Sequence, residues 1–272
     1  MLLAGKSAMP AAARERAAAL RDLLKNLPEV AVAFSGGLDS RFLCHAALLC
    51  GCRVVALHAH GPHVPRQESL LAQSWARQHG LHLLLVDYNP LPAPEVAGNS
   101  RQRCYGCKRG LVAALRRALA RWPEAVLCDG TNADDVLALR PGLRALAEGG
   151  VRSPLAEAGM SKEVVRVVAR GTGLDRPDQR ARPCLLTRLA YGLAPREDLL
   201  LRLARAEEKL ESLGGAAEGL GDLRLRLRPE PLLQAEFLPE AWREQVEAVL
   251  QEAEFWPCEV RVGGSPTGFF DA

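Results

Sequence analysis

A phosphate-binding loop is predicted by the residue types and spacing of one segment, Ser35-Gly36-Gly37-Leu38-Asp39-Ser40. Glycines adopt positive φ and let the backbone approach a ligand closely, and the unpaired N–H groups that open a helix attract anions. Ser35 and Ser40 add hydroxyl donors, while Asp39 is an acceptor that suits Mg²⁺ beside the phosphates. We therefore expect a phosphate site here rather than an ordinary glycine-rich turn.

Two common classes of phosphate-binding motif are missing from the sequence. The chain has no G-x-x-x-x-G-K-[ST], and no G-x-G-x-x-G follows a strand, so neither a kinase-type P-loop nor a dinucleotide fold is supported. The S-G-G-x-D-S pattern instead resembles the PP-loop ATP pyrophosphatases, which include NAD and GMP synthetases and several sulfur transferases. That resemblance implies cleavage of ATP between its α and β phosphates, with the substrate activated as an adenylate.

Three cysteines have settings suited to chemistry. Cys104 and Cys107 form a C-x-x-C pair in a loop before a helical pattern, which is typical of half a metal site or of a redox pair. Cys184 has basic neighbours, which favour its thiolate. These neighbours are Arg180, Arg182 and Arg188. No second C-x-x-C completes a zinc site, and three thiolates suit a four-iron cluster with one open iron. The alternative is three unrelated structural cysteines.

Carboxylates and histidines follow two other predicted strands. Gly130, Asp134 and Asp135 come after the strand at 125–128, and each aspartate is either a metal-binding or orienting carboxylate or a helix N-cap. The strand at 53–58 ends in a group of histidines, His58, His60 and His63. These are either a metal cluster or, as we prefer, part of a strand end that lines the nucleotide through backbone groups.

The elements that must position these residues alternate between strands and helices. Strands are predicted at 30–34, 53–58, 81–86 and 125–128, and helices at 11–27, 40–49, 68–79 and 108–121. We expect an α/β fold of the PP-loop (adenine nucleotide alpha hydrolase-like) type, with a parallel sheet and flanking helices, over residues 1–189. Ligands of such sheets bind at the carboxyl ends of the strands, so the loops that carry these residues should converge. Residues 87–103 are predicted to be a long loop.

The alternation loosens near residue 190, and we expect a small α+β domain over 190–272. Its predicted elements are a helix at 195–213 with a solvated or subunit-facing surface, a glycine-rich linker at 214–221, a half-buried strand at 223–227, a helix at 239–253 and a strand at 259–262. A homo-oligomer is expected.

The composition is that of an ordinary globular protein. The chain has 272 residues, 48% of them apolar and 25% charged, and its net charge of +3 is too small to indicate a nucleic-acid partner. No signal peptide and no apolar run of about 18 residues is visible, so we expect a cytoplasmic protein without a membrane partner. Its eight cysteines are then expected to be thiols. Packing roles are predicted for Cys44, Cys50, Cys52, Cys128 and Cys258.

Several motifs in a fixed order sharpen the resemblance. They are Ser35 to Ser40, Cys104-Tyr-Gly-Cys-Lys108, Asp129-Gly-Thr-Asn-Ala-Asp-Asp135, Arg140-Pro-Gly142, Ser153-Pro-Leu-Ala-Glu-Ala158 with Lys162, and Pro183-Cys-Leu185 with Tyr191-Gly192. Over roughly residues 15–215 the chain resembles the LarE family of ATP-dependent sulfur transferases, which serves synthesis of the nickel-pincer nucleotide cofactor.

This resemblance implies a reaction and its cofactors. The enzyme would adenylate a carboxylate of a pyridinium dicarboxylate mononucleotide and replace a carboxylate oxygen with sulfur. ATP, Mg²⁺ and a [4Fe-4S] cluster on Cys104, Cys107 and Cys184 are the implied cofactors, with a separate sulfur donor as a possible partner. Other members sacrifice the sulfur of the cysteine that matches Cys184. Because this chain has all three cysteines, we favour the cluster version.

Residue roles follow from the same resemblance. Asp39 and Cys184 are the expected catalytic residues. The nucleotide and the substrate are expected to contact the 35–40 segment together with His58, Gly130, Asp135, Arg188, Arg224 and Arg226. Arg224 and Arg226 alternate on one predicted strand face, and they either hold the substrate phosphate or are solvated strand arginines. The chain departs from relatives at 232–237 and 262–265, which concerns recognition of that phosphate.

Two other classes of function compete with this prediction. A tRNA-thiolating PP-loop enzyme would need a basic RNA-binding extension or a zinc domain, and neither is visible in the sequence. A non-catalytic nucleotide-binding partner would tolerate replacement of Asp39 or Cys184.

Overall fold

The chain forms two compact units in the computed structural model, which describes residues 9–137, 141–213, 220–263 and 269–270. The first unit comprises Met1–Gly61, Gln67–Pro90 and Cys104–Arg182, and the second comprises Pro62–Arg66, Leu91–Arg103 and Pro183–Ala272. The domains expected at 1–189 and 190–272 stay a prediction, because a compact unit is not thereby shown to be an independently folding domain.

The first unit is built on a four-stranded parallel sheet, as the sequence predicts. Its strands are β1 (Glu29–Ala33), β2 (Val54–His60), β3 (His82–Asp87) and β4 (Ala125–Cys128), in the order β3-β2-β1-β4. Val30 of β1 pairs with Val54 on one side and with Val126 on the other. The near-continuous apolar character of β1 fits a strand that is covered on both faces.

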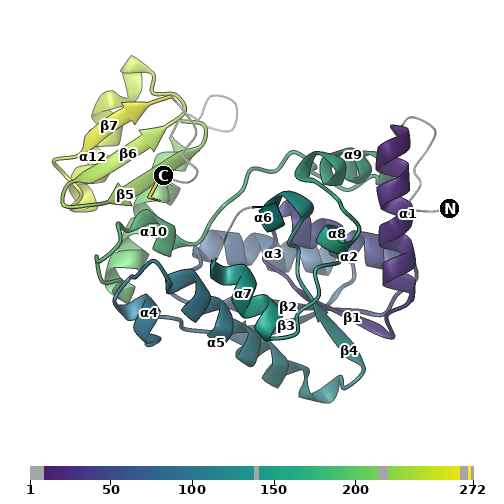
Figure 1. Cartoon of the computed structure of the whole chain (residues 1–272). Helices are drawn as coiled ribbons and strands as arrows, with labels where there is room; N and C mark the ends of the chain where they lie inside the picture. The colour runs from purple at the N-terminus through teal and green to yellow at the C-terminus, as the bar shows by residue number, and fades with distance from the viewer. Residues whose placement is uncertain (1–8, 138–140, 214–219, 264–268, 271–272) are drawn as a thin grey trace. The chain divides into compact units, whose positions relative to one another are not determined.

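Helices cover both faces of this sheet (Figure 1). One face packs against α1 (Ala11–Lys25), α2 (Leu38–Leu49), α3 (Arg66–Gln78) and α9 (Lys162–Thr172). The other face packs against α5 (Arg103–Ala118) and α7 (Pro141–Glu148). Alternate residues of β1 divide between the two cores, since Val30 and Val32 belong to the first and Ala31 to the second. The sheet thus forms the centre of an α/β layer arrangement.

The prediction of one loop over residues 87–103 is wrong at its end. This stretch contains the short helix α4 (Pro94–Ala97), and α5 already begins at Arg103 rather than at residue 108. Cys104 and Cys107 therefore lie in the first turns of a helix and not in a loop. The glycine between them, Gly106, weakens the helical signal by about 1 kcal/mol, but packing of α5 on the sheet outweighs that cost.

Residues 133–172 contain helices that the sequence analysis did not assign. They are α6 (Ala133–Leu137), α7, α8 (Pro154–Glu157) and α9. Helix α9 has a clear start, because the Ser161 side chain accepts a hydrogen bond from the N–H of Val164. It ends at Gly173, whose φ of 81° provides the left-handed C-cap.

The second unit combines helices with a three-stranded mixed sheet. The strands are β5 (Leu223–Leu227), β6 (Pro231–Ala235) and β7 (Glu259–Val262), with β5–β6 antiparallel and β6–β7 parallel. Helix α10 spans Glu197–Ser212, η3 spans Leu185–Arg188, η4 spans Glu240–Trp242 and α12 spans Arg243–Glu252. β6 was not assigned from the sequence. Most of the predicted linker at 214–221 lies outside the described residues.

The predicted strand at 223–227 is confirmed as β5, but the prediction that it is half-buried is wrong. All five residues of β5 are buried, including Arg224 and Arg226, which are only 3% and 4% exposed. The alternation of Leu and Arg suggested one solvent-exposed face. Both faces of the strand are covered instead, and the two arginines bond to polar groups within the protein.

None of the helices in the described part of the chain has the length and apolar character that a membrane crossing demands.

Candidate functional site

The 35–40 loop connects β1 to α2 in the geometry that an anion needs. Gly36 has a φ of 80°, in the left-handed region, whereas Gly37 is extended and serves as the N-cap of α2. No side chain of the described residues caps this helix, so its first N–H groups are open to a ligand. The Ser35 and Ser40 hydroxyl oxygens lie 3.2 Å apart, and both sit beside these groups. The loop can therefore present backbone and hydroxyl donors to one phosphate.

Two glycines allow the elements around the loop to approach closely. A Cβ at Gly36 would lie 2.7 Å from the Cβ of Ala72 on α3, and a Cβ at Gly130 would lie 2.9 Å from the nitrogen of Ser40. Gly130 follows β4, the neighbour of β1 on the side opposite to β2. The chain thus reverses its strand order between β1 and β4, which is the point where open parallel sheets bind ligands. Gly130 and the 35–40 loop converge there, as expected.

Asp39 and Lys162 form an ion pair beside the loop. The Lys162 Nζ lies 2.5 Å from Asp39 Oδ2, and both side chains are about three-quarters covered. The other carboxylate oxygen, Oδ1, is buried and makes no hydrogen bond with any described residue. Burial raises the pKa of Asp39, Lys162 opposes that rise, and the nearby Asp135 carboxylate adds to it. A divalent cation would satisfy the buried oxygen.

Asp134 and Asp135 take part in helix capping. The Asn132 side-chain oxygen accepts from the N–H groups of Asp134 and Asp135, so Asn132 caps α6. The Asp135 carboxylate in turn accepts a hydrogen bond from the N–H of Asn132, which completes a reciprocal capping pair. Asp134 accepts from the N–H of Lys162 at the start of α9. The structure therefore shows capping for both aspartates, and a metal role for Asp135 stays a prediction.

His58 is held by two hydrogen bonds inside the first unit. Its Nδ1 lies 2.9 Å from the Phe34 carbonyl oxygen, and its Nε2 lies 2.8 Å from the Ser69 hydroxyl. Both ring nitrogens are thereby engaged. Among the described residues, no group of three or more His, Cys, Asp or Glu side chains could hold a metal ion. This leaves no support for a cluster of His58, His60 and His63, and Cys104, Cys107 and Cys184 do not form such a group either, so ligation by these three cysteines stays a prediction.

Cys104 and Cys107 share one face of α5, because they are three residues apart in a helix. Cys104 is exposed and Cys107 is half-buried. Between them, the Tyr105 hydroxyl donates to Glu148 on α7 at 2.7 Å. The Tyr88 hydroxyl donates to the main-chain oxygen of Cys107 at 2.5 Å. These contacts connect the first turns of α5, which carry the two thiols, to Tyr88 and to α7.

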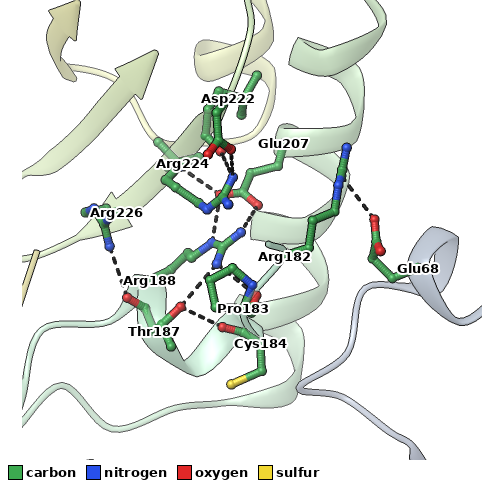
Figure 2. Close-up of polar contacts among 12 residues, drawn as sticks. Glu68, Arg182, Pro183, Cys184, Thr187, Arg188, Glu207, Asp222, Arg224 and Arg226 are labelled. Atoms are coloured by element: carbon green, nitrogen blue, oxygen red, sulfur yellow. Dashed lines mark hydrogen bonds and ion pairs between the residues drawn. The ribbon is translucent and has the colours of Figure 1, made fainter. Parts of the chain in front are cut away.

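Cys184 opens the short helix η3 in the second unit. Its carbonyl oxygen accepts from the N–H and the hydroxyl of Thr187 at 3.0 and 2.8 Å. Its sulfur points away from the Arg188 side chain (Figure 2). Two of its expected basic neighbours are paired with carboxylates, Arg182 with Glu68 at 3.1 Å and Arg188 with Glu207 at 2.9 Å.

Arg188 and Glu207 make the best-defined ion pair of the second unit. Arg188 donates from Nε and Nη2 to the two oxygens of Glu207, at 3.0 and 2.9 Å, and both residues are buried. Glu207 Oε1 also accepts from the N–H of Leu225 in β5 at 2.8 Å. The pair therefore ties η3, α10 and β5 together.

Arg224 and Arg226 lie beside this pair, as Figure 2 shows. Arg224 pairs with Asp222, and Arg226 donates to Gln234 and to the Thr187 carbonyl oxygen. Burial lowers the pKa of Arg226 to about 10, with Arg188 and Arg224 as further causes. The cluster of Arg188, Arg224, Arg226, Glu207 and Asp222 has three cations and two carboxylates. Burial of both strand arginines excludes the alternative that they are solvated, and guanidinium groups have the donor geometry that suits an anion.

Two residues of these sites were not recognised as site residues from the sequence. Lys162 was noted only as part of a motif, and its pairing with Asp39 joins residues that are 123 positions apart. Glu207 belonged to a helix whose charged residues were predicted to face solvent or a subunit. A signal existed for Glu207, since it falls on the same helical face as the buried Leu200, Leu203 and Leu210.

Curated relatives resemble the chain over most of its length. The uncharacterized protein slr1717 of Synechocystis sp. is 36% identical over 196 residues, 72% of this chain and 73% of the relative. The pyridinium-3,5-bisthiocarboxylic acid mononucleotide synthase of Lactiplantibacillus plantarum is 32% identical over 193 residues, 70% of each chain. The uncharacterized protein MJ0830 of Methanocaldococcus jannaschii is 28% identical over 201 residues, 74% and 75% respectively. No protein-family model matches the chain.

The four-stranded parallel sheet with helices on both faces defines an α/β protein of Rossmann-like type. With 32% identity to the mononucleotide synthase over 70% of both sequences, the chain belongs to the LarE family, as the motif resemblance predicted.

Proposed function

We propose that the protein is an ATP-dependent sulfur transferase that converts a carboxylate of a pyridinium dicarboxylate mononucleotide into a thiocarboxylate. The relative from Lactiplantibacillus plantarum is named as a synthase of a bisthiocarboxylic acid mononucleotide, which supports this substrate class. The single observation that carries the proposal is the open N-terminus of α2 with Asp39 and Lys162 beside it. This site lies at the strand reversal between β1 and β4, where a nucleotide is expected.

In the first step the substrate carboxylate is activated. One of its oxygens attacks the α-phosphorus of ATP, the bond to the β-phosphate bridge oxygen breaks, and pyrophosphate leaves. The N–H groups at the start of α2 and the Ser35 and Ser40 hydroxyls stabilise the charge that builds up on pyrophosphate. Lys162 is within reach of the same charge once it leaves Asp39.

Mg²⁺ fits the donors of this site. Asp39 offers a buried carboxylate oxygen that makes no hydrogen bond to the described residues, and the neighbouring Asp135 carboxylate adds negative charge. Hard oxygen donors of this kind are the ligands that Mg²⁺ prefers. A bound Mg²⁺ would neutralise the phosphate oxygens. Asp39 would hold it, and Lys162 would then be released toward the nucleotide.

In the second step sulfur replaces the activated oxygen. A hydrosulfide sulfur attacks the acyl carbon, the C–O bond to AMP breaks, and a thiocarboxylate, AMP and a proton result. In the alternative, the Cys184 thiol attacks and displaces AMP. Loss of the Cα proton and cleavage of the Cβ–S bond then leave the sulfur on the substrate and dehydroalanine at position 184.

The cysteines have the donor chemistry of an iron–sulfur ligand set. Cys104 and Cys107 share one face of α5, one exposed and one half-buried, so both thiols suit ligation. Cys184 is the third proposed ligand, from the second unit. A [4Fe-4S] cluster held by these three thiols would supply the sulfide for the second step. The residues Tyr105 and Tyr88 keep the first two ligands in place.

The substrate phosphate is proposed to bind at the arginine cluster defined above. Arg224 and Arg226 are buried, and the positive charge of Arg188 acts on both. Burial, and then the neighbouring cations Arg188 and Arg224, lower the pKa of Arg226, so an added anion would stabilise its charged form. Recognition by planar, bidentate arginines suits a phosphate group.

Analysis of the nucleotide products tests the proposed function. Purified protein is incubated without oxygen with Mg·ATP and the pyridinium dicarboxylate mononucleotide, and the nucleotides are separated by anion-exchange chromatography. We expect AMP and pyrophosphate in equal amounts, only when the mononucleotide is present, and none with Asp39→Asn. Formation of ADP and phosphate, or cleavage that ignores the mononucleotide, contradicts the proposal.

A further inference from the structure

The segment of residues 175–182, which we name the strap, is held against the elements that form the 35–40 loop. It starts one residue after Leu174, which belongs to the main core of the first unit. It ends at Arg182, the last residue of that unit before Pro183 and Cys184. None of the proposed steps uses its residues, although three side-chain contacts fix it along its length.

The first contact is made by Arg41, which directly follows Ser40 in α2. Its side chain is completely buried and contacts Asp175 and the Trp75 ring. Its Nη1 donates to the Asp175 carbonyl oxygen at 3.0 Å and to Asp175 Oδ2 at 3.1 Å, and its Nη2 donates to the Arg176 carbonyl oxygen at 3.0 Å. One guanidinium therefore holds three oxygens of the strap.

Trp75 of α3 completes this anchor. Its indole N–H donates to Asp175 Oδ1 at 2.7 Å, and the Arg41 guanidinium carbon lies 5.5 Å from the centre of the Trp75 ring. Trp75 is 2% exposed and stacks on Phe34, the residue that joins β1 to the loop. Asp175 thus receives bonds from α2 and α3 at once.

The other two contacts lie further along the strap. The Gln179 side-chain nitrogen donates to the carbonyl oxygen of Gly36 within the loop itself, at 3.4 Å. Arg182 pairs with Glu68 in the first turn of α3 at 3.1 Å (Figure 2). The strap is therefore fixed at its start, at its middle and at its end, each time to the loop or to a helix that flanks it.

We propose that Arg41 is a positioning residue for sulfur transfer. By holding the strap at Asp175, it restrains the backbone that leads to Cys184, because the strap is fixed to the 35–40 loop and its flanking helices. The inference rests on the proposed function. Cys184 is two residues beyond Arg182, so their Cα atoms are at most about 7 Å apart. A strap fixed at Arg182 therefore limits where the Cys184 backbone can be.

A buried arginine is well suited to this task. Its planar guanidinium serves several acceptors in one fixed geometry, which a lysine cannot do. Releasing the Asp175 end would loosen the strap, which Gln179 and Arg182 alone would then hold, without removing any group proposed to contact ATP. Misplacement of a reacting group by about 1 Å can cost on the order of 100-fold in rate. The expected defect is therefore in the sulfur step and not in adenylation.

The ratio of thiocarboxylate to pyrophosphate tests this inference. Both products are measured in one reaction with the full-length wild type, Arg41→Met and Gln179→Ala. We expect the ratio to fall about tenfold or more in Arg41→Met and less in Gln179→Ala, while pyrophosphate release changes only a few-fold. Arg170→Gln is the matched control, because Arg170 pairs with Asp178 on the exposed side of the same strap, and it should keep the wild-type ratio.

Trypsin cleavage of the same proteins without ligands gives a second readout. We expect faster cleavage after Arg180 in Arg41→Met, because the strap has lost one of its anchors. A variant that is merely destabilised lowers both products together and leaves the ratio unchanged. An unchanged ratio in Arg41→Met, with a wild type that is active, overturns the inference alone. A wild type without mononucleotide-dependent pyrophosphate release overturns the proposed function and this inference with it.

Discussion

The ammonium nitrogen of Lys162 lies 2.5 Å from one carboxylate oxygen of Asp39, at the first turn of α2. In the protein without ligands, the lysine thus provides the positive charge beside a carboxylate that suits Mg²⁺. The second Asp39 oxygen is buried without a hydrogen bond to the described residues, so the pair alone leaves the carboxylate incompletely satisfied. In our account, Asp39 would bind the Mg²⁺ of Mg·ATP, and Lys162 would leave Asp39 and contact the phosphates.

Replacement of Lys162 should therefore affect activity much more than stability. Lys162→Met removes a cation from the phosphate site, and we expect pyrophosphate release to fall on the order of 100-fold, as when a transition-state donor is lost. Lys209→Met is the matched control, since Lys209 pairs with Glu252 on the surface. Steady-state release of pyrophosphate measures both, and equal activities of the two variants would contradict a role of Lys162.

Two glycines with similar φ allow the cost of backbone strain to be measured apart from the cost of a close packing contact. Gly36 and Gly51 have φ values of 80° and 77°, but only at Gly36 would a Cβ meet another atom, at 2.7 Å from Ala72. We expect Gly51→Ala to cost about 1 kcal/mol of unfolding free energy from strain alone. Gly36→Ala should cost about 2 kcal/mol more, because the added methyl overpacks the contact with α3.

Urea unfolding of the two glycine variants measures the difference. Binding of ATP provides the second comparison, since only the Gly36 variant should weaken it. Equal unfolding free energies would show that the contact with Ala72 relaxes freely.

The buried ion pair of the second unit should be sensitive to loss of one charge. Glu207→Gln keeps the size of the side chain but leaves the Arg188 guanidinium without its carboxylate inside the protein. Breaking a buried pair in this way costs about 3–5 kcal/mol. Asp198→Asn is the control, because the Arg196–Asp198 pair is exposed, and it should leave stability essentially unchanged. Thermal unfolding that is equally affected in both variants would contradict the buried pair as described.

Burial of His63 should lower the unfolding free energy of the protein at acid pH. Burial lowers its pKa from 6.5 to about 4, so the folded protein disfavours the protonated ring. The stability that this neutral histidine allows is complete above pH 6.5 and is lost as the pH falls toward 4, because the unfolded chain binds the proton first. The loss amounts to about 3 kcal/mol.

Comparison with His63→Gln isolates this component. The variant should lose less unfolding free energy than the wild type between pH 6.5 and 4, measured by urea unfolding at each pH. Parallel pH profiles of the two proteins would rule out His63 as the source.

The cysteines of α5 should determine whether iron is bound. The wild type, purified and reconstituted without oxygen, is expected to contain about four iron and four sulfide per chain with visible absorbance. The double variant of Cys104→Ala and Cys107→Ala should lose both, whereas Cys258→Ala is the control and should keep them. An iron-free wild type whose chain loses the mass of H₂S at Cys184 during turnover would instead support sacrifice of that cysteine.

Much of the parallel fold could be predicted because its signals are local. Each strand of the first sheet is an apolar run, and helical spacing between the runs separates them, so β1 to β4 and most of their helices follow from periodicity. The 35–40 loop is also local, since strand, glycines and helix are consecutive. Gly106 hides the start of α5 in the sequence, because a glycine there is typical of a loop and only the packing of α5 on the sheet favours a helix.

The remaining features depend on contacts between distant residues. The alternation in β5 predicts one solvent-exposed face, yet Asp222 is a partner of Arg224, and Gln234 and the Thr187 carbonyl oxygen are partners of Arg226. Arg41 looks like an ordinary helix residue, because its partner Asp175 is 134 positions away. A single sequence contains no signal for such pairs.

An isotope measurement tests the central claim most directly, namely that the substrate carboxylate is activated as an adenylate before sulfur enters. The mononucleotide is labelled with ¹⁸O in its carboxylate oxygens and converted by the wild-type protein with unlabelled Mg·ATP. Our account predicts one ¹⁸O in the phosphate of each AMP formed, one AMP per thiocarboxylate, and unlabelled pyrophosphate, as read by mass spectrometry. Unlabelled AMP, or ¹⁸O in released phosphate or pyrophosphate, would contradict it.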